Sequence, residues 1–252
     1  SPALWLLISI IIICCMKPLC HGFSVSNPTK TNKAERNTDS YVDDATTWAS
    51  AFFEPDVSPN ELALRLQHDA QTWEQLLHVT GGKLAWTKCG FYLMAWKWDT
   101  EGVASLQTPA DLDLSISLED TQDGTKHVFK PRDCSSSHCI LGVHKAPSGN
   151  QARQVKVLRH KSDTFAKVIR IAGLPRIYAE TAYWMIYQPG LTYPLPSTFL
   201  IEPEIQKIQT VAISSFLSAM GYNSKMARAV VFGPIGLGGI GLRHLLTEQG
   251  LG

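Results

Sequence analysis

The chain has 252 residues, of which 44% are hydrophobic and 18% are charged, and its formal net charge is +1. This composition excludes a globally disordered chain and leaves room for one large domain or two small ones. The near-zero net charge also excludes a strong overall field that would by itself select nucleic acid or a membrane as the partner.

An almost wholly apolar stretch, residues 3–16, comes first. It is shorter than the roughly 20 residues that a membrane span requires. No basic segment precedes it and no small-residue cleavage site follows it, so a signal peptide is not indicated. We therefore expect no membrane association and predict a buried helix that begins at Pro2 and ends at Lys17-Pro18. A membrane-anchored protein is the alternative.

Residues 21–37 are polar and predict a loop or hairpin, and residues 58–82 then form the clearest amphipathic pattern of the chain. Ser58 is the expected N-cap of this helix, in a capping box, and Gly81-Gly82 is its expected end. A strand pair or hairpin is predicted within residues 88–98. The apolar stripe of the helix consists of Leu62, Leu66, Ala70, Trp73 and Leu77.

The C-terminal third of the chain is predicted to be mostly helical, and the middle to be mixed. Residues 99–138 begin with an acidic run without Lys or Arg, which predicts a solvated, partly irregular insertion. A short strand at 139–143 and a basic helix at 151–172 follow, and the apolar face of this helix is predicted to consist of Val155, Leu158, Phe165 and Ile169. Two more helices are expected at 179–187 and 204–220, separated by Pro189, Pro194 and Pro196. The fold class predicted from these elements is α+β.

The six cysteines show no spacing typical of a disulfide framework. We therefore expect reduced thiols in an intracellular protein of the cytoplasm or nucleus, which is not secreted. A zinc site is the alternative for one segment, and its Cys-x4-Cys spacing is at the loose end of what zinc ligation uses. The residues of this segment are His127, Cys134, His138, Cys139 and His144.

Two adjacent aspartates, Asp43 and Asp44, follow Tyr41 and Val42. Neighbours within a regular strand point to opposite faces, but at a tight hairpin turn two carboxylates can converge. Converging carboxylates suit Mg²⁺, which keeps water and phosphate oxygens in its other positions. Two such ions about 4 Å apart can activate a 3′-hydroxyl and stabilise a leaving pyrophosphate. An exposed polar turn is the alternative reading.

The sequence YVDD at residues 41–44 resembles the YxDD box of reverse transcriptases, the RNA-directed DNA polymerases of retroelements. The segments before and after this box resemble the neighbouring motifs of the family, in the same order. SPALWLLIS at residues 1–9 resembles the Ser-Pro helix before that box, and GKL at 82–84 with Lys88 resembles the motif after it. Residues 89–98 stand where the primer grip would be. Beyond residue 98 the likeness is diffuse, resting on ILGV at 140–143, LTY at 191–193, KIQ at 207–209 and GGIGL at 238–242.

The resemblance implies a partial right-hand palm in residues 1–98, an antiparallel sheet with helices. The insertion at 99–138 and a helical, thumb-like connection region at 139–252 would follow. It also implies a Mg²⁺ cofactor, an RNA template, a DNA primer and deoxynucleoside triphosphates.

The same resemblance implies roles for individual residues. Asp43 would be the main metal ligand and Asp44 the auxiliary one. Tyr41 would pack under the primer end or the template, and Lys88 would lie near the triphosphate. Ser1 and Pro2 would begin the helix that supports the incoming nucleotide and the template base.

The chain departs from the family in two ways. A further metal-binding aspartate, on a strand before the Ser-Pro helix, and the basic fingers would both lie upstream of Ser1. Ala85 also stands where Asn is frequent. We therefore expect a retrotransposon reverse transcriptase fragment that is inactive alone, with the missing N-terminal fingers and palm portion of the same polyprotein as a partner. The alternative is a non-catalytic nucleic-acid-binding or structural remnant of a retroelement.

The basic helix is expected to hold the template–primer by its phosphates, which requires no base reading. A solvated helix face is the alternative. The basic residues are Arg153, Lys156, Arg159, Lys161, Lys167 and Arg170.

Two further patterns have ordinary structural readings. Tyr183, Trp184 and Tyr187 are expected in the core rather than as stacking platforms for bases. GLGGIG at residues 236–241 matches a dinucleotide-binding pattern, but no second strand with an acidic end follows it. We expect a flexible or tightly turning loop there.

Overall fold

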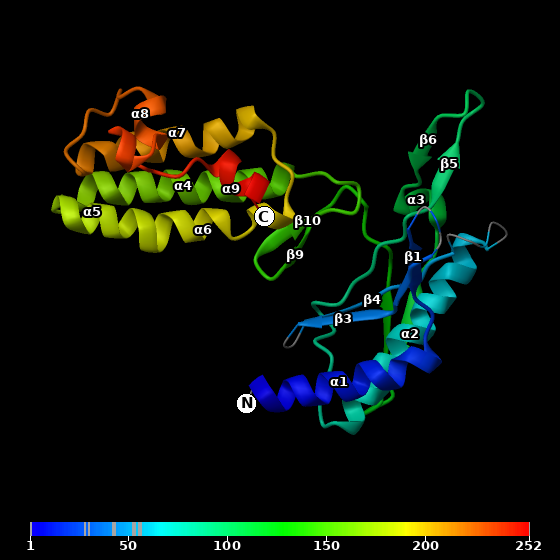
Figure 1. Ribbon diagram of the computed structural model, residues 1–252. Coiled ribbons are helices and arrows are strands. Elements are labelled where there is room, and N and C mark those ends of the chain that lie inside the picture. The colour runs from blue at the N-terminus through cyan, green and yellow to red at the C-terminus, as the bar shows by residue number, and fades with distance from the viewer. Residues whose placement is uncertain are drawn as a thin grey trace. The chain divides into compact units, whose positions relative to one another are not determined.

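The computed structural model of the protein, shown in Figure 1, describes residues 2–27, 29, 31–41, 44–51, 54 and 57–251. Ser1 and Asp43, two of the predicted site residues, lie outside the described residues. The chain is a mixed α+β protein with two-stranded antiparallel sheets and a mostly helical C-terminal half, which confirms the predicted fold class. It divides into two compact units, residues 1–134 and 135–252.

The N-terminal unit contains two long helices, α1 (Pro2–Leu19) and α2 (Pro59–Val79). They pack through a small apolar cluster that includes Met16 of α1 and Trp73 of α2. The predicted cap of α2 is present, because the backbone N–H of Glu61 donates to the Ser58 hydroxyl at 3.2 Å. The chain leaves this helix through Gly81, whose φ of +81° suits glycine.

Helix α1 differs from the prediction of a buried helix. Ile12 and Met16 are buried, but the opposite side of the helix is exposed. The sequence has no polar face here, so periodicity could not show that only one face is covered. Within the described residues, no helix combines the length and the apolar character needed to cross a bilayer. The exposed side chains include Leu4, Leu6, Leu7, Ile10 and Ile11.

Two hairpins lie between these helices in sequence. Strands β1 (Phe23–Ser26) and β2 (Lys33–Arg36) pair antiparallel, so residues 21–37 form a hairpin, one of the two alternatives predicted there. Strands β3 (Thr38–Tyr41) and β4 (Asp44–Thr47) form the second pair. Thr38 of β3 is buried and its hydroxyl donates to the Met16 sulfur at 3.5 Å, so this hairpin is attached to α1.

The acidic segment contributes regular structure to the N-terminal unit. Strand β5 (Trp96–Trp98) pairs with β6 (Ala104–Leu106), so the partner of this strand lies in the acidic segment and not within residues 88–98 as predicted. The short helix α3 (Pro109–Leu112) follows. Strands β7 (Ile116–Glu119) and β8 (Lys126–Phe129) then form a hairpin that packs against α2.

The C-terminal unit begins with a hairpin of β9 (His138–Ile140) and β10 (Val143–Lys145). The turn between them consists of Leu141 and Gly142, with φ of +51° and +78°. Two successive positive φ values are the backbone of a type I′ turn. The single strand predicted for residues 139–143 is therefore wrong, since Leu141 and Gly142 reverse the chain.

Helices α4 (Ala152–Ala172) and α7 (Glu202–Ala219) lie side by side and form the main core of the C-terminal unit (Figure 1). The predicted apolar face of the basic helix is confirmed, because Leu158 and Ile169 are buried in this core while Val155 and Phe165 pack against it.

Between α4 and α7 the chain is helical for longer than predicted. Helix α5 (Arg176–Ala182) continues through a π-helical turn, η1 (Tyr183–Tyr187), into α6 (Gln188–Thr192). Pro189 stands in the first turn of α6, where the missing N–H costs little, so the break predicted at Pro189 is wrong. The chain leaves the helix only at the following prolines, around the 3₁₀ turn η2 (Leu195–Ser197).

The last elements are α8 (Arg228–Phe232), the 3₁₀ turn η3 (Ile235–Leu237) and α9 (Leu245–Leu251). The glycine-rich segment forms a tight turn, one of the two conformations predicted for it. Gly238 and Gly241 have φ of +81° and +78°. The backbone N–H of Gly241 donates to the carbonyl of Gly233 at 2.9 Å, so this segment folds back on the end of α8.

Candidate functional site

The predicted metal-binding box lies where two antiparallel strands meet. Tyr41 is the last residue of β3 and Asp44 is the first residue of β4, and the register pairs them directly. Asp44 is exposed. Val42 and Asp43 lie outside the described residues. The described part of the box therefore leaves Asp44 at the end of a strand pair and not in a helix or in the middle of a strand.

A third aspartate lies close to this box on β3. The guanidinium of Arg36 donates to both carboxylate oxygens of Asp39, at 3.0 Å and 3.3 Å. Both side chains are exposed. Asp39 is therefore engaged by Arg36 at the end of β2, in the preceding hairpin, and is a poor candidate for a further metal ligand beside Asp44.

Asp120 anchors the segment that carries the GKL motif to the β7–β8 hairpin. Its carboxylate accepts hydrogen bonds from the Lys83 ammonium at 3.0 Å, from the indole N–H of Trp86 at 3.0 Å and from the backbone of Gln122 at 2.9 Å. The hydrogen bond from Lys83, followed by that from the Gln122 backbone, lowers the pKa of Asp120 to about 2. Asp120 thus stays ionised and holds this segment in place.

Lys88 lies at the end of this segment in a turn, where its backbone N–H donates to the carbonyl of Ala85 at 2.8 Å. Its side chain is exposed. Across the described residues, no hydrogen bond or ion pair joins Lys88 to Asp44. The structure therefore does not bring these two predicted site residues into contact, and the place of Lys88 near a triphosphate stays a prediction.

Other predicted site residues stand near the start of the chain. Ser1 lies outside the described residues, and Pro2 is the first residue of α1.

The zinc alternative for residues 127–144 finds no support in the described residues, where the group close enough to hold a metal is His21, His68 and Asp69. The cysteines are all free.

The basic side chains of α4 form an open face. Arg153, Lys156, Arg159 and Lys167 are exposed, and none of them forms an ion pair with a described residue. From the helical period, Arg153, Lys156 and Lys167 lie within about 60° of one another around the axis and extend over about 21 Å along it. The other two basic residues, Lys161 and Arg170, are also exposed, but each is engaged by the backbone: Lys161 donates to the Gly190 carbonyl and Arg170 to the Ala166 carbonyl.

The predicted core aromatics are confirmed for Tyr183 and Tyr187, which are both 0% exposed. Burial raises the pKa of both phenols. Trp184 is different, because it is 38% exposed and the guanidinium of Arg243 lies 5.8 Å from its ring centroid. The two tyrosines are therefore unavailable for base stacking.

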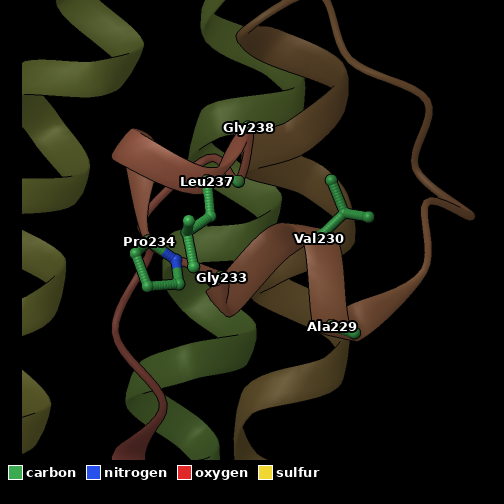
Figure 2. A pocket seen from close by; sticks show the side chains of 7 residues that line it. Ala229, Val230, Gly233, Pro234, Leu237 and Gly238 are labelled. Atoms are coloured by element: carbon green, nitrogen blue, oxygen red, sulfur yellow. The ribbon is translucent and has the colours of Figure 1, made fainter.

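A shallow hollow of about 270 Å³ lies at the glycine-rich turn, and Figure 2 shows it from close by. Its lining has no charged or hydrogen-bonding side chain that would orient a nucleotide. Residues 229–232 before this turn are helical, whereas a dinucleotide site requires a strand there. Dinucleotide binding is thus not supported. The lining consists of Ala229, Val230, Gly233, Pro234, Leu237, Gly238 and Gly239.

Comparisons of this chain with protein-family models, with curated proteins and with solved structures find no match.

One group of chemically capable side chains, His21, His68 and Asp69, was not predicted from the sequence. The only local signal was the adjacent pair His68-Asp69 within α2, where Asp69 is buried beside the apolar stripe. His21 is 48 residues from Asp69, and only the fold brings them together.

Proposed function

We propose that this chain is part of an RNA-directed DNA polymerase of a transposable element. It would contain the metal-binding hairpin of the palm and a thumb-like helical region. The observation that carries the proposal is the pairing of Tyr41 with Asp44 at the adjoining ends of two antiparallel strands. The chain reverses direction between Tyr41 and Asp44, and we propose that Asp43 and Asp44 bind the same cation at this junction.

The order and packing of the neighbouring elements support this proposal. The helix that carries the Ser-Pro motif, α1, contacts the β3–β4 hairpin through Met16 and Thr38. The hairpin is followed by α2 and then by the anchored segment with Lys83 and Lys88. This is the order that the resemblance to reverse transcriptases predicts.

Residues of this chain would then have defined roles in nucleotidyl transfer. Asp43 and Asp44 would hold Mg²⁺ through carboxylate oxygens, the donors that this ion prefers. Bound Mg²⁺ would supply charge stabilisation to the attacking 3′-oxygen and the departing pyrophosphate. Lys88 would pair with the triphosphate, and Tyr41 would support the primer end or the template.

The proposed site is incomplete within the described residues. The β3–β4 sheet has two strands, so no neighbouring strand presents a further carboxylate beside Asp44 there. In-line phosphoryl transfer loses most of its electrostatic stabilisation when one metal-binding strand is absent. We propose that residues 1–252 alone are inactive and that the fingers and remaining palm of the same polyprotein pack on the exposed apolar face of α1.

Primer extension tests the inactivity. The purified chain is incubated with a poly(A) template, an oligo(dT) primer, dTTP and Mg²⁺. We expect incorporation no higher than with the double variant Asp43→Asn and Asp44→Asn. Robust incorporation by the unmodified chain, lost in that variant and retained in the control Asp113→Asn, would contradict the inactivity while supporting the polymerase.

A non-catalytic nucleic-acid-binding remnant is the second candidate. The open basic face of α4 favours it, because phosphate contacts alone are sufficient for binding without sequence preference. This candidate differs from the first in one respect: it requires no cation at the β3–β4 hairpin.

A further inference from the structure

Two histidines and a buried aspartate meet between the end of α1 and the middle of α2. His21 lies two residues beyond the end of α1, whereas His68 and Asp69 are neighbours on α2. The side chain of Asp69 is 1% exposed, while those of His21 and His68 are 41% and 57% exposed. The carboxylate thus lies at the base of the cluster and the two imidazoles form its open side.

The ring nitrogens converge on one carboxylate oxygen. The Nδ1 atoms of His21 and His68 lie 2.9 Å and 3.2 Å from Oδ1 of Asp69. The backbone N–H of His21 donates to the same oxygen at 3.1 Å. One ligand atom from each of the three side chains can be chosen so that all lie within 4.8 Å of one another.

These separations are close to those of a tetrahedral zinc site. Zinc–nitrogen and zinc–oxygen bonds of about 2.0–2.1 Å place neighbouring ligand atoms about 3.3 Å apart. The two nitrogen–oxygen separations observed here differ from that value by a few tenths of an ångström. Side-chain rotations that bring the two imidazole nitrogens, which lie within 4.8 Å of each other when the ligand atoms are suitably chosen, closer together would admit the ion.

The second carboxylate oxygen is an independent indication that a ligand is expected. Oδ2 of Asp69 is buried and has no hydrogen-bond partner among the residues described. A buried carboxylate oxygen without a partner is unfavourable unless a cation or a donor compensates it. The Cys20 thiol adjoins this carboxylate but does not belong to the group of converging atoms.

We propose that His21, His68 and Asp69 bind a Zn²⁺ ion, independently of the proposed function. Two imidazole nitrogens and one carboxylate oxygen favour zinc over Mg²⁺, which prefers oxygen donors throughout. The fourth position is open to water. Because His21 and Asp69 are 48 residues apart, the ion would fasten the end of α1 to α2 and stabilise the N-terminal unit.

Calorimetric titration of the chelator-treated chain with ZnCl₂ tests this site, and Co²⁺ absorption reports its coordination. We expect one equivalent of Zn²⁺ and a tetrahedral Co²⁺ spectrum. His21→Ala and His68→Ala should each weaken binding by about 100-fold or more, since even outer-sphere changes at zinc sites cost about 10- to 100-fold. His78→Ala, another histidine of α2 outside the cluster, should bind as the unmodified chain does.

Both histidines are partly exposed, so their removal should leave the fold intact, and circular dichroism checks this for each variant. Two results would overturn the proposal. The first is the lack of stoichiometric binding by the unmodified chain. The second is unchanged affinity in both histidine variants, as expected if zinc is bound by the cysteines instead.

Discussion

Replacing Arg153, Lys156, Arg159 and Lys167 with alanine is expected to remove most of the salt-sensitive affinity of the chain for an RNA–DNA hybrid. Each phosphate that a basic side chain neutralises adds about 0.9 to the slope of log K against log salt concentration, so four contacts add about 3.6. The affinity of the unmodified chain should therefore fall about 100-fold more than that of the variant between 50 and 200 mM salt. Fluorescence anisotropy with a labelled hybrid measures both slopes.

A charge-matched control separates this face from a general effect of charge. Four exposed lysines of the N-terminal unit, Lys33, Lys97, Lys126 and Lys130, can be replaced with alanine together. This control has the same net charge as the α4 variant and should retain the slope of the unmodified chain. Equal losses in the two variants would show that α4 has no special part in binding.

Phe216→Ala is expected to lower the free energy of unfolding of the C-terminal unit by about 3–5 kcal/mol. Phe216 is 0% exposed, and its ring centroid lies 5.3 Å from that of Tyr183 and 5.0 Å from that of Tyr187. Alanine would leave a cavity among these rings, which their own packing prevents from closing. Urea denaturation followed by circular dichroism measures the change.

The control for this prediction is Phe199→Ala. Phe199 is 79% exposed, so its replacement should change the stability by less than about 0.5 kcal/mol. A loss of less than about 1 kcal/mol in Phe216→Ala would contradict the aromatic core described between α7 and the π-helical turn.

The helices with one polar and one apolar face could be predicted from the sequence, because period and caps are local signals. The Ser58 cap, the Gly81 end and the buried face of α4 with Leu158 and Ile169 were all predicted. The buried face of α1 could not be predicted in this way, because almost every position of this helix is apolar. Its exposed face became visible only in the structure.

Strand pairing was less predictable, because it depends on partners that are distant in sequence or on the turn between them. Trp96–Trp98 pairs with Ala104–Leu106 across an acidic loop that had suggested irregular structure. Leu141 and Gly142 resemble a strand by composition, but the pairing of β9 with β10 makes them a turn.

The candidate sites also differ in how well they could be predicted from the sequence. The aspartate box is a contiguous motif, so the sequence alone was sufficient to propose it. The cluster of His21, His68 and Asp69 joins a residue just beyond the end of α1 to two residues in the middle of α2. It could be recognised only from the packing of α1 on α2. The anchoring role of Asp120 was likewise not predicted, because this residue belongs to the acidic segment that had been interpreted as a solvated insertion.

The most direct test of the polymerase proposal is a titration of the ¹⁵N-labelled chain with Mn²⁺, which replaces Mg²⁺ at oxygen sites and broadens nearby amide signals. We expect the amides of the β3–β4 junction, Tyr41 and Asp44 among them, to broaden at lower Mn²⁺ concentrations than those of other exposed acidic residues. The double variant Asp43→Asn and Asp44→Asn should abolish this broadening. Broadening spread over the exposed acids without preference for that junction, or unchanged in the double variant, would contradict a metal-binding palm hairpin.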